Sequence, residues 1–179
     1  MLRSFATKSS FSVIRQQPQR DNSHLNDKKH KCLGNSKSYD GLVRLLNSMN
    51  YPNNVRDAQS LEMLNRGAPL QHLSLLRFAL VEYNALLCQH IQNKGYIIDT
   101  PDNRSFIENV LRLHREYPIQ GFKKWKRLKS IKPDAFLRLD YKAHRKLTFT
   151  VACVFWAKVK GKELDGHVAA SSETIDDHH

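Results

Sequence analysis

Apolar residues recur at helical spacing through the middle of the chain, and each such segment ends at a glycine or a proline. Leu42, Leu45, Leu46 and Met49 lie three or four positions apart, for example, and their helix must end before Pro52. The third segment carries apolar residues on more than one face, so we expect it to be a long, central and mostly buried helix. The pattern predicts helices over residues 38–50, 57–66, 71–93 and 101–117.

In the C-terminal third, Gly121 and Pro133 interrupt the helical pattern, and a basic stretch lies between them before the last apolar segment. We expect a loop over residues 119–132 and a short helix over 133–139. The β-branched residues of 141–159 favour a strand, whereas the spacing of the apolar residues there is helical. We predict a helix, because no second strand is available to pair with it.

These segments predict one all-α domain of about six helices over residues 38–163. Residues 1–37 and 164–179 are polar and are expected to be disordered, because they bury too little apolar surface to offset chain entropy. The first twenty residues contain several arginines and serines and no acid, which is also typical of a mitochondrial transit peptide. A plain basic tail is the first interpretation of this segment, and a cleaved targeting peptide is the alternative.

The formal net charge of +12 is unevenly distributed along the chain. Residues 1–37 contain eight Lys and Arg against two acids, and residues 112–162 contain fifteen against three. Residues 163–179 contain five acids and no Lys or Arg. Crowded like charges repel one another and are better tolerated where a polyanion neutralises them. The basic region therefore predicts an anionic partner, with a merely solvated basic face as the alternative.

The candidate contact residues lie in the predicted 119–132 loop and along the last predicted helices. Lys142, Arg145 and Lys146 share one helical face by their i, i+3 and i+4 spacing. Trp125 lies between two pairs of basic residues and is the aromatic residue that we expect to anchor a partner, whereas Phe122 and Phe136 are expected to pack in the core. The predicted polyanion-binding set is Lys123, Lys124, Trp125, Lys126, Arg127, Lys129, Lys132, Arg138, Lys142, Arg145, Lys146, Lys158, Lys160 and Lys162.

Sequence motifs for catalysis or metal binding do not occur in the chain. Cys32, Cys88 and Cys153 have no CxxC or CxxH spacing, so the sequence indicates neither a disulfide framework nor a zinc site, and Cys88 and Cys153 are expected to be small core residues. The histidines expected at helix surfaces or edges are His72, His90, His114 and His144. Because these motifs are missing, we predict no enzyme and no cofactor. We also predict no membrane partner, because no apolar run is long enough to span a bilayer.

Short motifs follow one another in a characteristic order: Asn50-Tyr51-Pro52 with Val55, Leu64 and Gly67, Phe106-Ile107, Val110, Leu113 and Arg115, and Tyr141 to Leu147 with the basic end Lys158 to Leu164. Their order and spacing resemble the N-terminal calponin-homology-like domain of the centrosomal protein of forty-four kilodaltons family, centriolar proteins that bind microtubules. The resemblance implies a non-catalytic calponin-homology-like helical bundle at the centrosome, a basal body or a ciliary axoneme. The implied partners are tubulin, as microtubules, and other centriolar or axonemal proteins. The segment 119–130 is longer and more basic than the usual family linker, so no role is carried over to it.

Nucleic acid is the second candidate partner. Proteins that bind single strands stack bases on aromatic rings while cations neutralise the phosphates. The aromatic residues interleaved with the cations are Tyr117, Phe122, Trp125, Phe136 and Tyr141. Together with the transit-like start, they define the alternative of a mitochondrial RNA-binding or ribosome-associated protein, although no RNP1, KH, zinc-finger or basic-zipper pattern is present.

Overall fold

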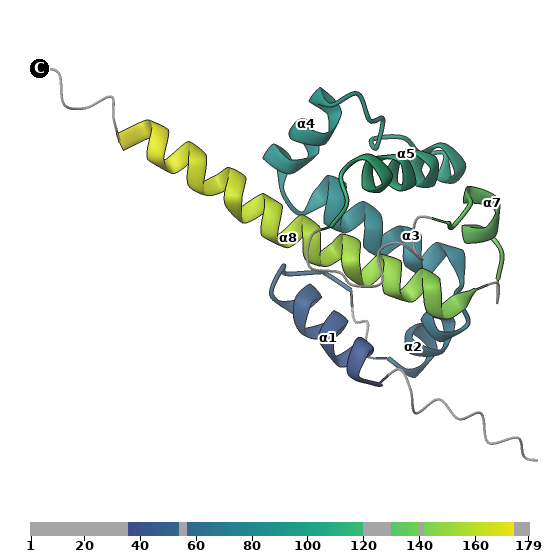
Figure 1. Cartoon of the computed structure of the whole chain (residues 1–179). Helices are drawn as coiled ribbons and strands as arrows, with labels where there is room; N and C mark the ends of the chain where they lie inside the picture. The colour runs from purple at the N-terminus through teal and green to yellow at the C-terminus, as the bar shows by residue number, and fades with distance from the viewer. Residues whose placement is uncertain (1–35, 54–56, 120–129, 140–141, 174–179) are drawn as a thin grey trace, which may run out of the picture. The chain divides into compact units, whose positions relative to one another are not determined.

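The described residues of this protein, in a computed structural model, are 36–53, 57–119, 130–139 and 142–173, all within the unit Leu33–His179. Every regular element in these ranges is helical and none is a strand, which confirms the all-α prediction and the choice of helix for the last segment. The elements are α1 Ser36–Asn47, α2 Ala58–Asn65, α3 Pro69–Arg77, the π-helical segment η2 Phe78–Glu82, α4 Ala85–Asn93, α5 Asn103–Glu116, α7 Pro133–Phe136 and α8 Ala143–Glu173 (Figure 1).

The helix predicted over 71–93 is not continuous. It consists of α3, η2 and α4, and Asn84 separates the last two with an extended backbone at φ −149° and ψ 116°. The Asn84 side chain accepts a hydrogen bond from the Leu87 N–H at 2.8 Å and so caps α4. It also donates to the Asp165 carboxylate of α8 at 2.9 Å. Asparagine readily replaces helical backbone hydrogen bonds with side-chain ones, so the prediction of a single central helix here was wrong.

The central position belongs to α8, which contacts α1, α2, α3, η2 and α4 (Figure 1). Its first half buries side chains on several faces, as expected of a helix surrounded by others. The helix is longer than predicted and continues through residues 164–173 of the expected tail. Residues 174–179 and the N-terminal segment 1–35 lie outside the described residues.

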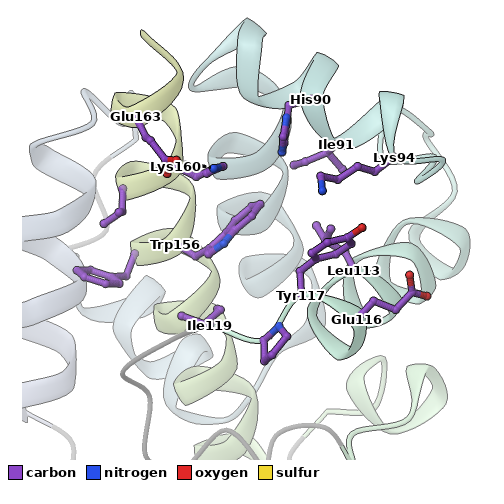
Figure 2. A pocket seen from close by; sticks show the side chains of 13 residues that line it. His90, Ile91, Lys94, Leu113, Glu116, Tyr117, Ile119, Trp156, Lys160 and Glu163 are labelled. Carbon is purple, nitrogen blue, oxygen red and sulfur yellow. Dashed lines mark hydrogen bonds and ion pairs between the residues drawn. The ribbon is translucent and has the colours of Figure 1, made fainter. Parts of the chain in front are cut away.

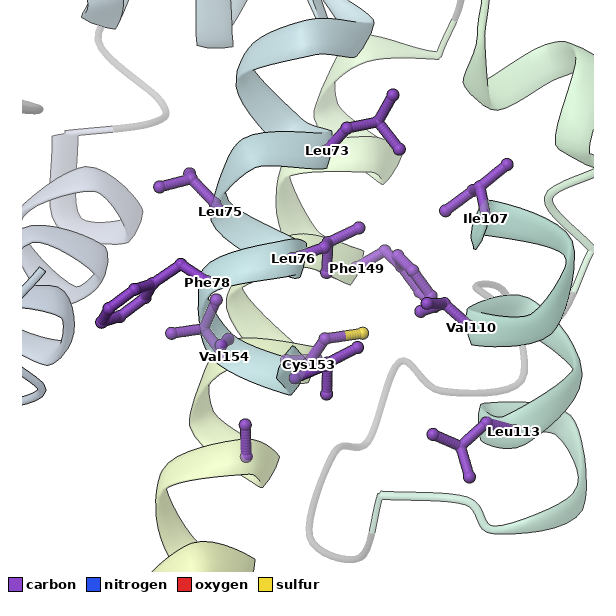
Figure 3. Packing of buried hydrophobic residues seen from close by; sticks show 14 of the residues in the cluster. Leu73, Leu75, Leu76, Phe78, Ile107, Val110, Leu113, Phe149, Cys153 and Val154 are labelled. Carbon is purple, nitrogen blue, oxygen red and sulfur yellow. The ribbon is translucent and has the colours of Figure 1, made fainter. Parts of the chain in front are cut away.

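The hydrophobic core lies on both sides of the α3–α8 pair. Figure 3 shows Ile107 and Val110 of α5 facing Phe149 and Cys153 of α8, while Phe78 points away from them toward α1. The core predictions hold for Phe136 and Cys153, both fully buried, whereas Cys88 is half-buried. Phe122 lies outside the described residues.

Two of the histidines expected at helix surfaces are instead fully buried. The Nδ1 atom of His72 lies 2.9 Å from the Thr150 hydroxyl of α8, and the ring of His114 packs edge-on against Trp156, with centroids 5.1 Å apart. Burial, reinforced by nearby Lys146, lowers the pKa of His72 to about 4, and burial lowers the pKa of His114 to about 3. Both therefore belong to the uncharged core at neutral pH, and the surface prediction was wrong for them. His90 is half-buried and His144 is exposed, as expected.

Candidate polyanion-binding interface

Lys146 organises the start of α8 from inside the protein. Its exposed fraction is 0 %, so the prediction that it lies on the surface with Lys142 and Arg145 was wrong. The Nζ atom donates to the Gly67 carbonyl oxygen at 2.9 Å and to the Arg138 carbonyl oxygen, and it lies 5.8 Å from the centre of the Phe136 ring. A buried ammonium group needs such acceptors because it has lost its water. Lys146 thus connects the turn after α2 and the segment after α7 to the first turn of α8.

The α2–α3 turn packs directly on the beginning of α8 at Gly67. This glycine has φ +66°, and a Cβ atom added to it would lie 2.8 Å from the Ala143 Cα atom and 2.9 Å from its Cβ atom. Only glycine combines the left-handed backbone with so close an approach. Gly67 is predicted from its residue type to follow the end of a helix, but its contact with α8 depends on the tertiary structure.

These contacts gather four exposed cations at the N-terminus of α8. Arg66 directly precedes Gly67 in the turn after α2, and Arg138 lies in the segment after α7, where its carbonyl accepts from Lys146. Lys142 directly precedes α8, and Arg145 lies in its first turn. We refer to Arg66, Arg138, Lys142 and Arg145 as the α8 basic cluster. Sequence reasoning missed Arg66, because it lies far from the basic region along the chain and only the Gly67–Ala143 contact brings it near.

The position of the α8 basic cluster on its helix strengthens its positive field. Unpaired N–H groups make a helix N-terminus partially positive, so acidic residues there stabilise a helix and basic ones destabilise it. The first turn of α8 has no acidic residue. Lys142 takes a left-handed backbone at φ +49°, and its carbonyl accepts from the N–H groups of Arg145 and Lys146 at 2.8 and 3.1 Å. Basic residues at a helix N-terminus thus lower helix stability, while the field there favours an anion.

The remaining predicted contact residues are dispersed. Lys132 is exposed just before α7. Lys158, Lys160 and Lys162 lie on α8 at least ~24 Å along the helix axis from Lys142. Two of these three have partners within the protein, since Lys158 donates to the Ser48 hydroxyl at 2.5 Å and Lys160 pairs with Glu163 at 2.9 Å. The others, Lys123, Lys124, Trp125, Lys126, Arg127 and Lys129, lie outside the described residues.

The aromatic residues proposed for base stacking do not form one platform in the described part of the chain. Phe136 is buried, and Tyr117 is 42 % exposed with the Lys94 ammonium group 3.9 Å from its ring centre. Trp125 and Tyr141 lie outside the described residues.

No group of three side chains that could bind a metal ion together occurs among the described residues. Within the same ranges, every helix is too short or too polar to cross a bilayer.

Comparison with known proteins places this helical arrangement in a family. The family model described as Centrosomal spindle body, CEP44, matches residues 36–170, from the start of α1 to the last turns of α8. No curated protein matches the chain. The matched region includes every member of the α8 basic cluster and all of the core described above. The resemblance found in the order of the sequence motifs is thereby confirmed at the level of the family, while its calponin-homology detail stays a prediction. The chain belongs to the CEP44 family of centrosomal spindle body proteins.

Proposed function

We propose that this protein attaches to microtubules of centrioles, basal bodies or ciliary axonemes, without catalysis, through the α8 basic cluster of a calponin-homology-like domain. Family membership supports a centrosomal location, in preference to the mitochondrial alternative. The observation that carries the proposal is the convergence of Arg66, Arg138, Lys142 and Arg145 around one helix N-terminus, held in place by buried Lys146. Tubulin is the proposed direct partner, and other centriolar or axonemal proteins are proposed to complete the attachment.

Electrostatic attraction brings tubulin and the α8 basic cluster together, and the fold determines the shape of the contact. Tubulin surfaces and tails are rich in acids, so a cationic cluster steers binding over a Debye length of ~8 Å at physiological salt. The contacts of Lys146 and Gly67 hold the turns that carry the cations against the start of α8, so a partner of complementary shape can recognise their arrangement. Lys162, exposed farther along α8, can add a second and weaker contact.

Paired charge-reversal variants test the position of the site. Lys142→Glu/Arg145→Glu is compared with Arg44→Glu/Arg115→Glu, which changes the net charge equally on exposed residues of α1 and α5. In cosedimentation with microtubules, we expect the cluster variant to lose about tenfold or more in affinity and the control about threefold or less. Circular dichroism checks that both remain helical.

Equal losses in the two variants would show that net charge alone governs binding and would refute the proposed site. A parallel titration with single-stranded RNA at matched salt covers the nucleic-acid alternative. Tighter binding to RNA than to microtubules, lost in the cluster variant, would favour that alternative instead.

A further inference from the structure

The exposed apolar side chains of the described residues are concentrated along one surface. Leu70, Ile97 and Leu139 lie elsewhere, Leu70 in a smaller hollow of about 150 Å³, whereas the rest line two hollows on either side of His90. The members of this second group are Leu86, Tyr117, Phe155, Val159 and Val168. Exposed apolar residues that lie together mark a binding surface more often than scattered ones do.

The two hollows adjoin and form one cleft between α4 and α8, because His90 lines both. The larger has a volume of about 540 Å³ and is closed at one end by α5, and the smaller, of about 360 Å³, runs toward the C-terminal end of α8. The floor is apolar, with Ile91 and Leu113 buried at 0 % and 1 % exposure. Figure 2 shows Trp156 extending from α8 across this floor toward α4 and α5. We call it the α4–α8 cleft.

The dimensions of the cleft suit a helix. Phe155 and Val168 lie at opposite ends of its α8 wall, and their separation of thirteen positions along the helix spans ~20 Å. Both walls are helices whose backbone groups are already hydrogen-bonded, so the cleft offers an extended peptide no strand edge to pair with. Recognition must occur through side chains, as when an amphipathic helix places its apolar face in a groove.

The formal charges on the rim balance, with Lys94 and Lys160 against Glu116 and Glu163, but they are not all paired with one another. Glu163 pairs with Lys160 at 2.9 Å, and Glu116 accepts from the neutral Tyr96 hydroxyl. Lys94 contacts only the Tyr117 ring, and no carboxylate pairs with it among the described residues. Burial is the main cause that lowers the pKa of His90, and nearby Lys94 and Lys160 add to it while Glu163 opposes it. An occupant with a carboxylate at the Lys94 end is therefore complementary.

We propose that the α4–α8 cleft docks an amphipathic helix of another protein, with apolar residues on one face and acidic residues beside them that meet Lys94. This interaction is separate from the α8 basic cluster, which lies at the opposite end of α8. The protein would then hold two partners at once, the proposed filament at the start of α8 and a helical protein along its later turns.

Helical peptides of about 16 residues provide the probe, displayed as a library with a fixed apolar face and randomised flanks. Selection on the full chain is expected to enrich Glu and Asp in the flank nearest Lys94. Binding is then measured for the selected peptides by the fluorescence of Trp156, which becomes the only tryptophan in a Trp125→Phe background. Val159→Glu and Phe155→Ser are each expected to weaken binding about tenfold or more. Ile97→Ser, at a more exposed apolar residue outside the cleft, is the control and should leave binding unchanged.

Lys94→Glu tests the chemistry of the partner, because it should reverse the preference for acidic flanks while leaving the apolar contacts in place. The proposal is overturned if peptides bind the Val159→Glu variant as tightly as the parent, or if no selected helix binds below about 100 µM. It is also overturned if sedimentation shows a dimer that Val159→Glu dissociates, since a second copy would then fill the cleft. Microtubule cosedimentation of Val159→Glu should equal that of the parent, so this proposal and the proposed function can fail separately.

Discussion

Replacing Lys146 by methionine should destabilise the protein, although the change removes a buried charge. Methionine retains the length of the side chain but loses two hydrogen bonds from a charged donor, each with a contribution of about 1.5–3 kcal/mol. Relief from desolvating the ammonium group offsets several kcal/mol of this loss. The buried Gly67 carbonyl is then left without its donor, at a cost of about 1–3 kcal/mol. The balance is a decrease of about 2 kcal/mol in the free energy of unfolding.

Urea and thermal denaturation followed by circular dichroism measure this effect, with exposed Lys142→Met as the control. A decrease of about 2 kcal/mol corresponds to a fall in Tm of about 4–8 °C for a domain of this size, whereas the control should change stability by less than about 0.5 kcal/mol. The same variant should weaken microtubule binding, because Lys146 positions the loops that carry Arg66 and Arg138. A Lys146→Met protein as stable as the parent would refute the assignment of Lys146 as the residue that holds the start of α8 together.

Three further predictions concern the same fold. Gly67→Ala should destabilise the protein by about 2–4 kcal/mol, because the added Cβ meets Ala143 and the backbone is left-handed, whereas Gly41→Ala, with open space around it, should be neutral or stabilising in the same thermal melts. His72 and His114 have folded-state pKa values of about 4 and about 3, below 6.5, so the unfolded chain binds more protons between these values. The free energy of unfolding should therefore decrease as the pH falls below 6.5, by up to about 1.4 kcal/mol per pH unit for each histidine, and urea midpoints at pH 5 and 7 that coincide would contradict this. Microtubule affinity of the parent should fall steeply with added salt, while that of the charge-reversed cluster variant should change little, and parallel salt titrations would reveal a failure of this pattern.

Local signals accounted for most helix boundaries and for the class of the fold. Pro52, Gly67 and Pro118 end helices in the structure near where their chemistry predicts, and the apolar spacing of α8 outweighed its β-branched residues. The exception was Asn84, a good capping residue within an apolar run, where hydrogen bonds to Leu87 and Asp165 divided the expected helix. Its contact with α8 could not be foreseen, because the two residues lie far apart in the sequence.

Charge and periodicity alone determined that this chain is an all-α protein with an excess of cations in its C-terminal third, because both properties depend on residue types and their spacing. Tertiary structure decided which of those cations face water. The same i, i+4 spacing that places Lys142 and Lys146 on adjacent turns fits a surface pair or a buried one, and the carbonyl groups of Gly67 and Arg138 made the difference. Likewise, Arg66 joined the α8 basic cluster, and Leu86 and Val168 came to share a cleft, only when helices distant in the sequence packed together. Burial depends on what lies opposite a residue, and a single helical pattern carries no information about its neighbours.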